Sequence, residues 1–215
     1  MTFDVIENPV TGERAVVRFA ATNAPGGLVV GDLYARPGAA VVGEHIHPHS
    51  TETFTVVRGS IGVRLGGHEQ LAGPGTRISV PPGTCHDWWN VGQETAWVIV
   101  EVAPGHRFET MIKNLFFLAA DGRTDARGRP GLMQAALLAR EFDDVIRFTS
   151  PPRVVQKVLF AAIAPLARRR GYLGSYPEYE RRVTATVEEL EPLPADIAAL
   201  LPAGVPGAAP GGPPG

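Results

Sequence analysis

The sequence predicts a mainly β domain followed by a C-terminal α-helical extension. Residues 1–104 contain short apolar or alternating runs, separated by Gly- and Pro-containing turns at regular spacing, which is typical of a sandwich or barrel. After Pro104 and Gly105, apolar residues recur at helical spacing instead. We therefore expect a β-barrel at residues 1–104, a helical extension at 105–191 and a Pro/Gly-rich tail at 192–215.

Six runs in the first unit have the composition of strands. Each is short, rich in apolar residues and bounded by turn residues, and no helix-length periodicity interrupts them. Hydrophobic residues make up 44% of the chain, enough for a sizeable buried core. The runs are AVVRFAA, LVVGDLYA, TFTVVRG, IGVRLGG, TRISVPPG and TAWVIVEVA.

Four helices are expected in the extension. In the third, Ser150 is a good N-cap and Pro151 a good first helical residue, and the arginines of its last turn suit the negative end of the helix dipole. Pro165 should kink this helix or start a new segment. The four helices are expected at residues 107–119, 131–148, 151–171 and 178–191.

The last 24 residues are expected to be disordered. From Pro192 onward they contain seven prolines and five glycines and end in GVPGAAPGGPPG. Such a composition buries too little apolar surface to offset the entropy of ordering the chain.

Composition argues against a nucleic-acid partner and indicates a compartment. The formal net charge is −2, and Arg168, Arg169 and Arg170 form the only basic run, so nucleic acid is not an expected partner. Cys85 is the only cysteine, which excludes an intrachain disulfide and fits a reducing cytosol. The N-terminus has no secretory signal pattern. We therefore expect a cytoplasmic protein.

The third expected helix, residues 151–171, contains the run VLFAAIAPLARRR. This apolar run is far shorter than the roughly 20 residues that span a bilayer, so no transmembrane segment is expected. Docking of the helix on the barrel is favoured over a dimer interface. Contact with a membrane surface, with the arginines near the headgroups, is the minor alternative.

Three of the six histidines lie within GEHIHPHSTETFTVVRG, residues 43–59. In a strand, His45 and His47 point to the same face. A turn at Pro48–Ser50 would bring Glu52, on the next strand, back beside them. Two imidazoles and a carboxylate in an apolar interior are hard to stabilise without a cation, and with one they make a typical transition-metal site.

A further histidine with the same character follows a Pro-Pro-Gly turn. In GTRISVPPGTCHDWWN, His86 opens a new strand, and Trp88 and Asn90 share its parity. His49 falls in the turn and is expected to be a turn residue. His68 and His106 are expected to be solvated or structural. A hydrogen-bonded histidine cluster without an ion stays open as the alternative.

These two stretches resemble the two motifs of the cupin superfamily. The first is His45-x-His47, four residues, Glu52, six residues and Gly59. The second is complete in spacing, and runs from Gly75 through Pro81-x-Gly83 and His86 to Asn90. Two departures occur: six residues separate Gly38 from His45, where the family has five, and Thr76 replaces an acidic residue. The resemblance covers roughly residues 25–103.

The resemblance implies a small double-stranded β-helix (jelly-roll) barrel with one divalent metal near its mouth. It carries over His45, His47, Glu52 and His86 as metal ligands. Iron, manganese, nickel, zinc and copper all occur in the family, and this ligand set does not choose between them. Cupins commonly pair, so a homodimer is expected.

The residues around the expected metal indicate the kind of substrate. By parity, four apolar side chains should line the pocket: Phe54, Val56, Ile78 and Trp88. Such a pocket favours a small organic molecule, aromatic or enolisable, over a phosphorylated sugar. We expect a metal-dependent enzyme, with a dioxygenase or other oxidoreductase favoured over an isomerase or cyclase and Glu52 as the catalytic group. The alternative is a non-catalytic metal- or ligand-binding module.

Overall fold

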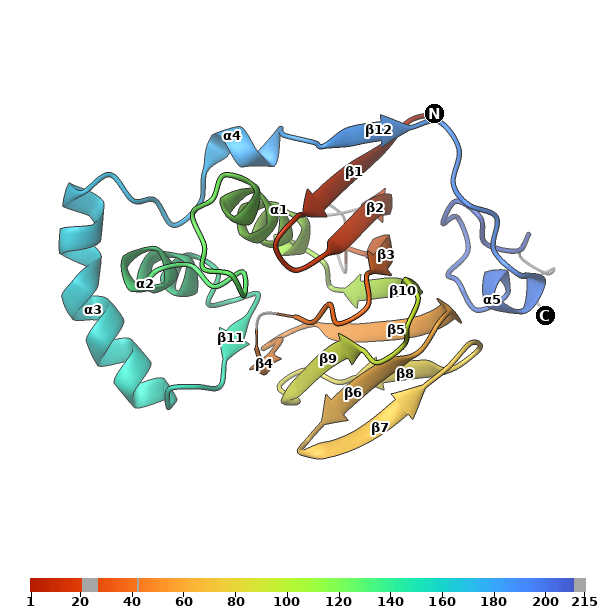
Figure 1. Cartoon of the computed structure of the whole chain (residues 1–215), viewed down its shortest axis with the longest axis horizontal. Helices are drawn as coiled ribbons and strands as arrows, with labels where there is room; N and C mark the ends of the chain where they lie inside the picture. The colour runs from red at the N-terminus through yellow and green to blue at the C-terminus, as the bar shows by residue number, and fades with distance from the viewer. Residues whose placement is uncertain (21–26, 42, 211–215) are drawn as a thin grey trace.

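The computed structural model describes residues 1–20, 27–41 and 43–210 of the chain. Two antiparallel sheets enclose a common core as a jelly-roll, and most of the helices lie on one side of it (Figure 1). This confirms the expected mainly β fold with helices in the C-terminal part of the chain.

The larger sheet has seven strands in the order β12-β1-β2-β3-β10-β5-β8. Five of them, β2, β3, β5, β8 and β10, were expected from the sequence runs, and β1 and β12 were not. The bounds are β1 Phe3–Asn8, β2 Glu13–Ala20, β3 Val29–Ala35, β5 Thr51–Arg58, β8 Arg77–Val80, β10 Ala96–Ala103 and β12 Ala185–Val187.

The smaller sheet has five strands in the order β11-β4-β9-β6-β7. Two of them, β4 and β11, are only two residues long, and they pair with each other. The bounds are β4 His45–Ile46, β6 Ile61–Leu65, β7 His68–Ala72, β9 His86–Asn90 and β11 Arg147–Phe148.

Buried side chains from both sheets fill the barrel. Gly59, between β5 and β6, has a φ of 80°, and a Cβ there would lie 2.9 Å from the Ala96 Cα. Only glycine therefore fits this turn without strain. The core residues include Leu33, Phe54, Val56, Ile61, Val63, Ile78, Val80, Trp88 and Val98.

The helical part begins as expected and then departs from expectation. Helix α1 spans Phe108–Ala120 and packs on β1, where Met111 and Phe117 join a buried cluster with Ile6. Helix α2 covers Leu132–Glu141 only, whereas one helix was expected over 131–148. The residues after Glu141 form a turn and the short strand β11 instead of a helix. Strand β11 forms there because it pairs with β4.

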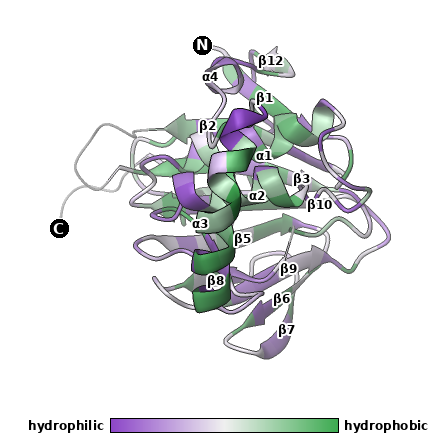
Figure 2. Cartoon of the chain, turned by 90° about the vertical axis from the view of Figure 1, so that its left-hand side faces the viewer, coloured by the Kyte–Doolittle hydropathy of each residue, from purple (hydrophilic) through white to green (hydrophobic). Residues whose placement is uncertain are grey.

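The third helix, α3, covers Arg153–Arg169 and continues through Pro165. It packs on α2 through Ala164 and Ala167 rather than docking on the barrel, which corrects the favoured expectation. Figure 2 shows that its turns divide into an apolar part and a polar part. Among the described residues, no helix is long and apolar enough to cross a membrane.

The expected helix at 178–191 is wrong for most of its length. Helix α4 spans only Pro177–Glu180. Strand β12 follows instead and pairs with β1 at the edge of the larger sheet. The open edge of β1 supplies hydrogen-bond partners that local sequence does not reveal.

The C-terminal segment is ordered against the barrel as far as residue 210, contrary to the expectation of disorder. Helix α5, Ala195–Ala198, buries Ile197, and Leu201 and Val205 pack beside it on the larger sheet. The Arg18 guanidinium donates to the carbonyl of Pro206. A few apolar side chains among the prolines are therefore enough to hold this segment in place, because the outer face of the larger sheet already presents an apolar surface. Residues 211–215, which were also expected to be disordered, lie outside the described residues.

Candidate metal centre and adjoining pocket

Four side chains expected to bind a metal converge in the barrel. His45 lies on β4, His47 just after it, Glu52 on β5 and His86 on β9. His45 and His86 are direct cross-strand partners. One ligand atom from each of the four lies within 4.8 Å of the others, and all four residues are buried. Two sheets and a tight turn therefore bring together residues separated by up to 41 positions in the sequence.

Backbone carbonyls hold the orientation of the three imidazoles. Each Nδ1 lies 2.7–3.0 Å from a carbonyl oxygen, and because a carbonyl only accepts, each Nδ1 carries the hydrogen. Each Nε2 is then left with a free lone pair, as metal-binding histidines require. For His45, His47 and His86, the carbonyls belong to Gly43, Val145 and Thr84, respectively.

The free lone pairs face the carboxylate of Glu52. Its Oε2 lies 2.9 Å from the His86 Nε2 and 3.3 Å from the His47 Nε2. The buried Nε2 of His47 has no hydrogen-bond partner among the described residues. Lone pairs that face one another away from water repel unless a proton or a cation lies between them. The residues present therefore fit a divalent transition metal, which would bind all four.

The pKa shifts of His45 and Glu52 agree with this fit, whereas that of His47 reflects its contact with the Glu52 carboxylate. Burial lowers the pKa of His45 to about 3, and repulsion from the other two imidazoles adds to the effect. Burial by itself would raise the pKa of Glu52, but the neighbouring His47 and His86 hold it below its usual range. Burial opposes charge on His47, yet Glu52 raises its pKa overall. A neutral imidazole and an ionised carboxylate are the forms that bind metals.

The helical part of the chain completes this centre. Val145, between α2 and β11, supplies the carbonyl that orients His47. The Phe108 ring on α1 lies 5.6 Å from the His47 ring, and the Phe148 ring on β11 lies 6.2 Å from that of His45. Sequence reasoning missed these residues, because nothing in their local pattern distinguishes them from core positions.

An apolar pocket of about 120 Å³ is lined by three of the four donors, His45, His47 and Glu52. Of the side chains expected to line it, Phe54 and Trp88 do so. Val56 and Ile78 belong to the barrel core instead, although they share the expected parity. Val56 lies two residues farther along β5 than Phe54, and Ile78 is directly opposite Phe54 on β8, so correct parity did not suffice to place a side chain in the pocket. Helix α1 lines the other side of the pocket through Phe108, Met111, Ile112 and Leu115.

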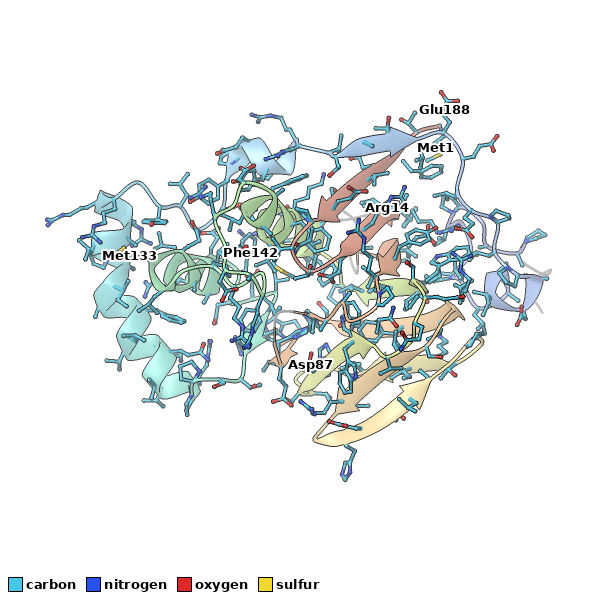
Figure 3. All side chains as sticks on the ribbon, in the orientation of Figure 1. Met1, Arg14, Asp87, Met133, Phe142 and Glu188 are labelled. Carbon is cyan, nitrogen blue, oxygen red and sulfur yellow. The ribbon has the colours of Figure 1, made fainter. Side chains whose placement is uncertain are left out.

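The other polar residues weighed in the sequence are not part of the donor group. His49, His68 and His106 are exposed. Asn90, the last residue of the second motif, donates through its amide to the carbonyls of Ala35 and Glu94 and so anchors a turn. Figure 3 shows Asp87, next to His86 in sequence, at the outer side of β9, as strand alternation requires.

Comparison with known families agrees with the motif spacing and the fold. The model of the cupin domain matches residues 34–109, which include all four donors. Residues 34–109 of the chain are a cupin domain. No curated protein matches it. The coarse expectation from the sequence, a cupin barrel with a group able to hold a metal ion, is confirmed.

Several solved cupin-like structures are similar to part of the chain. The cupin domain of Schizosaccharomyces pombe Cnp3 is 19% identical at a TM-score of 0.39, and covers 42% of this chain and 64% of its own. KdgF from a Halomonas species is 23% identical at a TM-score of 0.37, over 43% and 79% of the two chains. A Klebsiella pneumoniae protein with a double-stranded β-helix domain is 30% identical at 0.36, over 41% and 72%. This chain thus spans less than two thirds of the Cnp3 domain.

Proposed function

We propose that this cupin is a metal-dependent enzyme acting on a small, largely apolar organic substrate. The observation that supports the proposal is the arrangement of the donors: three imidazole Nε2 atoms and one carboxylate, oriented by backbone carbonyls, at the end of an apolar pocket. His45, His47, Glu52 and His86 would hold the metal. We favour a dioxygenase or other oxidoreductase over an isomerase or cyclase. Iron, manganese, nickel, zinc and copper all suit the ligand set.

The protein's own residues would position and deprotonate the substrate. A bound divalent metal supplies Lewis-acid chemistry or, if redox-active, electron transfer. Phe54 and Trp88 exclude water from one side of the pocket and Phe108 from the other. Glu52 is ionised, so it can accept a proton from an enolisable carbon or a hydroxyl when its carboxylate moves off the metal.

We also propose that residues 105–191 act as part of this site rather than as a separate module. Val145 and Phe148 contact the donors from within that range. Pairing of two copies into a homodimer remains a prediction, and size measurements in solution will test it. A cytoplasmic location likewise remains a prediction.

The first test is elemental analysis of protein purified without added metal. We expect about one equivalent of a transition metal in the wild type and in Glu94→Ala, which removes an exposed carboxylate, and a large loss in Glu52→Ala. Anaerobically Fe(II)-loaded protein is then tested for oxygen consumption with a panel of enols and catechols. Turnover in the wild type supports the oxidoreductase. Tight ligand binding without turnover, for any metal, would favour the non-catalytic binding module instead.

Retained metal with unchanged turnover in Glu52→Ala would remove that residue from the mechanism. Absence of metal from the wild type, together with failure to take up any of the five candidate metals, would refute the metal centre itself.

A further inference from the structure

Helix α3 turns an apolar face outward. Eight positions on its outer side are exposed and apolar, and 3.6 residues per turn place them in two adjoining rows along the helix. Surface helices usually turn charged and polar side chains outward, and contiguous apolar surface of this kind marks an interaction site. The first row is Val154, Val158, Ala161 and Pro165, and the second is Val155, Leu159, Ala162 and Leu166.

Contacts on the opposite side of α3 fix this orientation. Two alanines of α3 pack on α2, and the amide of the buried Gln156 donates to the carbonyls of Phe148 and Pro151. A rotation that buried the valines would break these hydrogen bonds, so Val154 and Val158 stay 74% and 68% exposed. Helix α3 lies at one end of the long axis of the molecule in Figure 1 and faces the viewer in Figure 2, so a flat surface can reach it.

The stretch that contains α3 is strongly basic. Residues 145–177 include six arginines and lysines and no acidic residue, so their formal charge is +6 in a chain of net charge −2. Asp143 pairs with Arg147 and Arg153, and among the described residues these are the ion pairs of this stretch. The charges that remain free of ion pairs are those of Lys157, Arg168, Arg169 and Arg170.

These free charges surround the apolar face. At about 100° per residue, Lys157 and Arg168 lie along one edge of the face and Arg170 along the other, while Arg169 lies at its C-terminal end. Long basic side chains lay their alkyl stems along apolar surface and keep the charge in water. An apolar face with basic edges is the arrangement of helices that lie in the headgroup region of a membrane.

Charge argues against a second copy of the chain as the occupant of this face. Two α3 helices paired antiparallel bring Arg153 and Lys157 of one copy against residues 168–170 of the other, and parallel pairing brings like ends together. Neither arrangement supplies an acidic partner from this stretch, and like charges repel. An anionic lipid surface supplies both a negative plane and an apolar interior.

We propose that α3 is a peripheral membrane anchor, which inserts its outward apolar face into the headgroup region of an anionic lipid surface while Lys157 and residues 168–170 contact the lipid phosphates. Each basic residue near such a surface strengthens binding about fivefold. The inference is independent of the proposed metal function, because none of the four donors belongs to α3.

The test is co-sedimentation of the full chain with vesicles of phosphatidylcholine, either pure or with about 30% phosphatidylglycerol. We expect binding to the anionic vesicles, at least about tenfold weaker binding to the neutral ones, and release as the salt concentration rises. Val154→Ser/Val158→Ser should weaken binding about tenfold, because two apolar side chains no longer insert. Arg168→Gln/Arg169→Gln should weaken it about 30-fold, since two charges are lost.

Matched variants elsewhere on the surface make the result specific. Leu71→Ser/Val91→Ser removes two exposed apolar side chains, and Arg36→Gln/Arg127→Gln removes two exposed charges. Both should bind vesicles as the wild type does. Because every substituted position is exposed, the urea midpoints of all four variants should stay close to that of the wild type.

A second measurement locates the contact. Val158→Trp adds an indole to the outer side of α3, and brominated lipid in anionic vesicles should quench its fluorescence. Absence of that quenching, failure of the wild type to bind anionic vesicles, or undiminished binding by both α3 double variants overturns the inference. A dimer in light scattering that becomes a monomer in Val154→Ser/Val158→Ser also overturns it, because a second copy then covers the face.

Discussion

The cost of burying Glu13 predicts a change in stability with pH that a single substitution should remove. The carboxyl is buried in the folded protein, and its pKa is raised from 4.5 to about 7. Below pH 4.5 it is protonated in both folded and unfolded chains, so it imposes no penalty. As the pH rises from 4.5 to 7, the unfolded chain ionises first, and the free energy of unfolding falls.

The size of the effect follows from the two pKa values. Each unit of difference corresponds to about 1.4 kcal/mol, so the fall approaches about 3 kcal/mol by pH 8. Glu13→Gln is isosteric and does not ionise. Its free energy of unfolding, relative to that of the wild type, should therefore rise by about 3 kcal/mol between pH 4.5 and pH 8.

Urea unfolding followed by circular dichroism at pH 4.5, 6 and 8 measures this difference. Taking the difference between two proteins cancels the titration of groups that both contain, including the metal-site histidines. Glu94→Gln serves as the control, because an exposed carboxylate should give a flat difference. A flat difference for Glu13→Gln too would refute the reasoning, since it would show that Glu13 is solvated or already paired in the folded state.

Three further predictions concern the rest of the molecule. Asp32→Ala should lower the free energy of unfolding by about 3–5 kcal/mol, because it leaves the buried Arg18 guanidinium unpaired; Glu191→Ala, which breaks the exposed pair with Arg58, should cost less than about 1 kcal/mol in the same urea titration. Ile197→Ala should cost about 2–4 kcal/mol if the C-terminal segment packs on the sheet, and an unchanged urea midpoint would restore the expectation of disorder. Zn(II) at about 100 times its dissociation constant should stabilise the wild type by about 2.7 kcal/mol in thermal unfolding, and should not stabilise His86→Ala; equal stabilisation of both would place the ion elsewhere.

The local sequence pattern was sufficient to predict most of the barrel strands and the four donor residues. Six of the strands were predicted from apolar runs between turn residues. A half-buried strand on a pleated sheet favours such residues, so its sequence shows the pattern directly. The donors were recognisable because their spacing matches strand parity and a tight turn. The same reasoning failed at residues 142–148 and 178–191, where apolar or polar periodicity looked helical. There, pairing with the edges of β4 and β1 outweighed local preference.

The sequence by itself determined the fold class, the four donors and the apolar character of the pocket, since each is encoded within a short stretch of chain. Only the tertiary structure decided what surrounds them. The carbonyl of Val145 orients His47 across 98 positions of sequence, and Glu13 shares a pocket with Glu52 although no local signal connects them. Every residue has a backbone carbonyl, so the residue type at position 145 does not reveal this contact. Whether a carboxyl is buried depends on which elements pack over it. Both are properties of how distant segments meet, so they are visible only once the chain is folded.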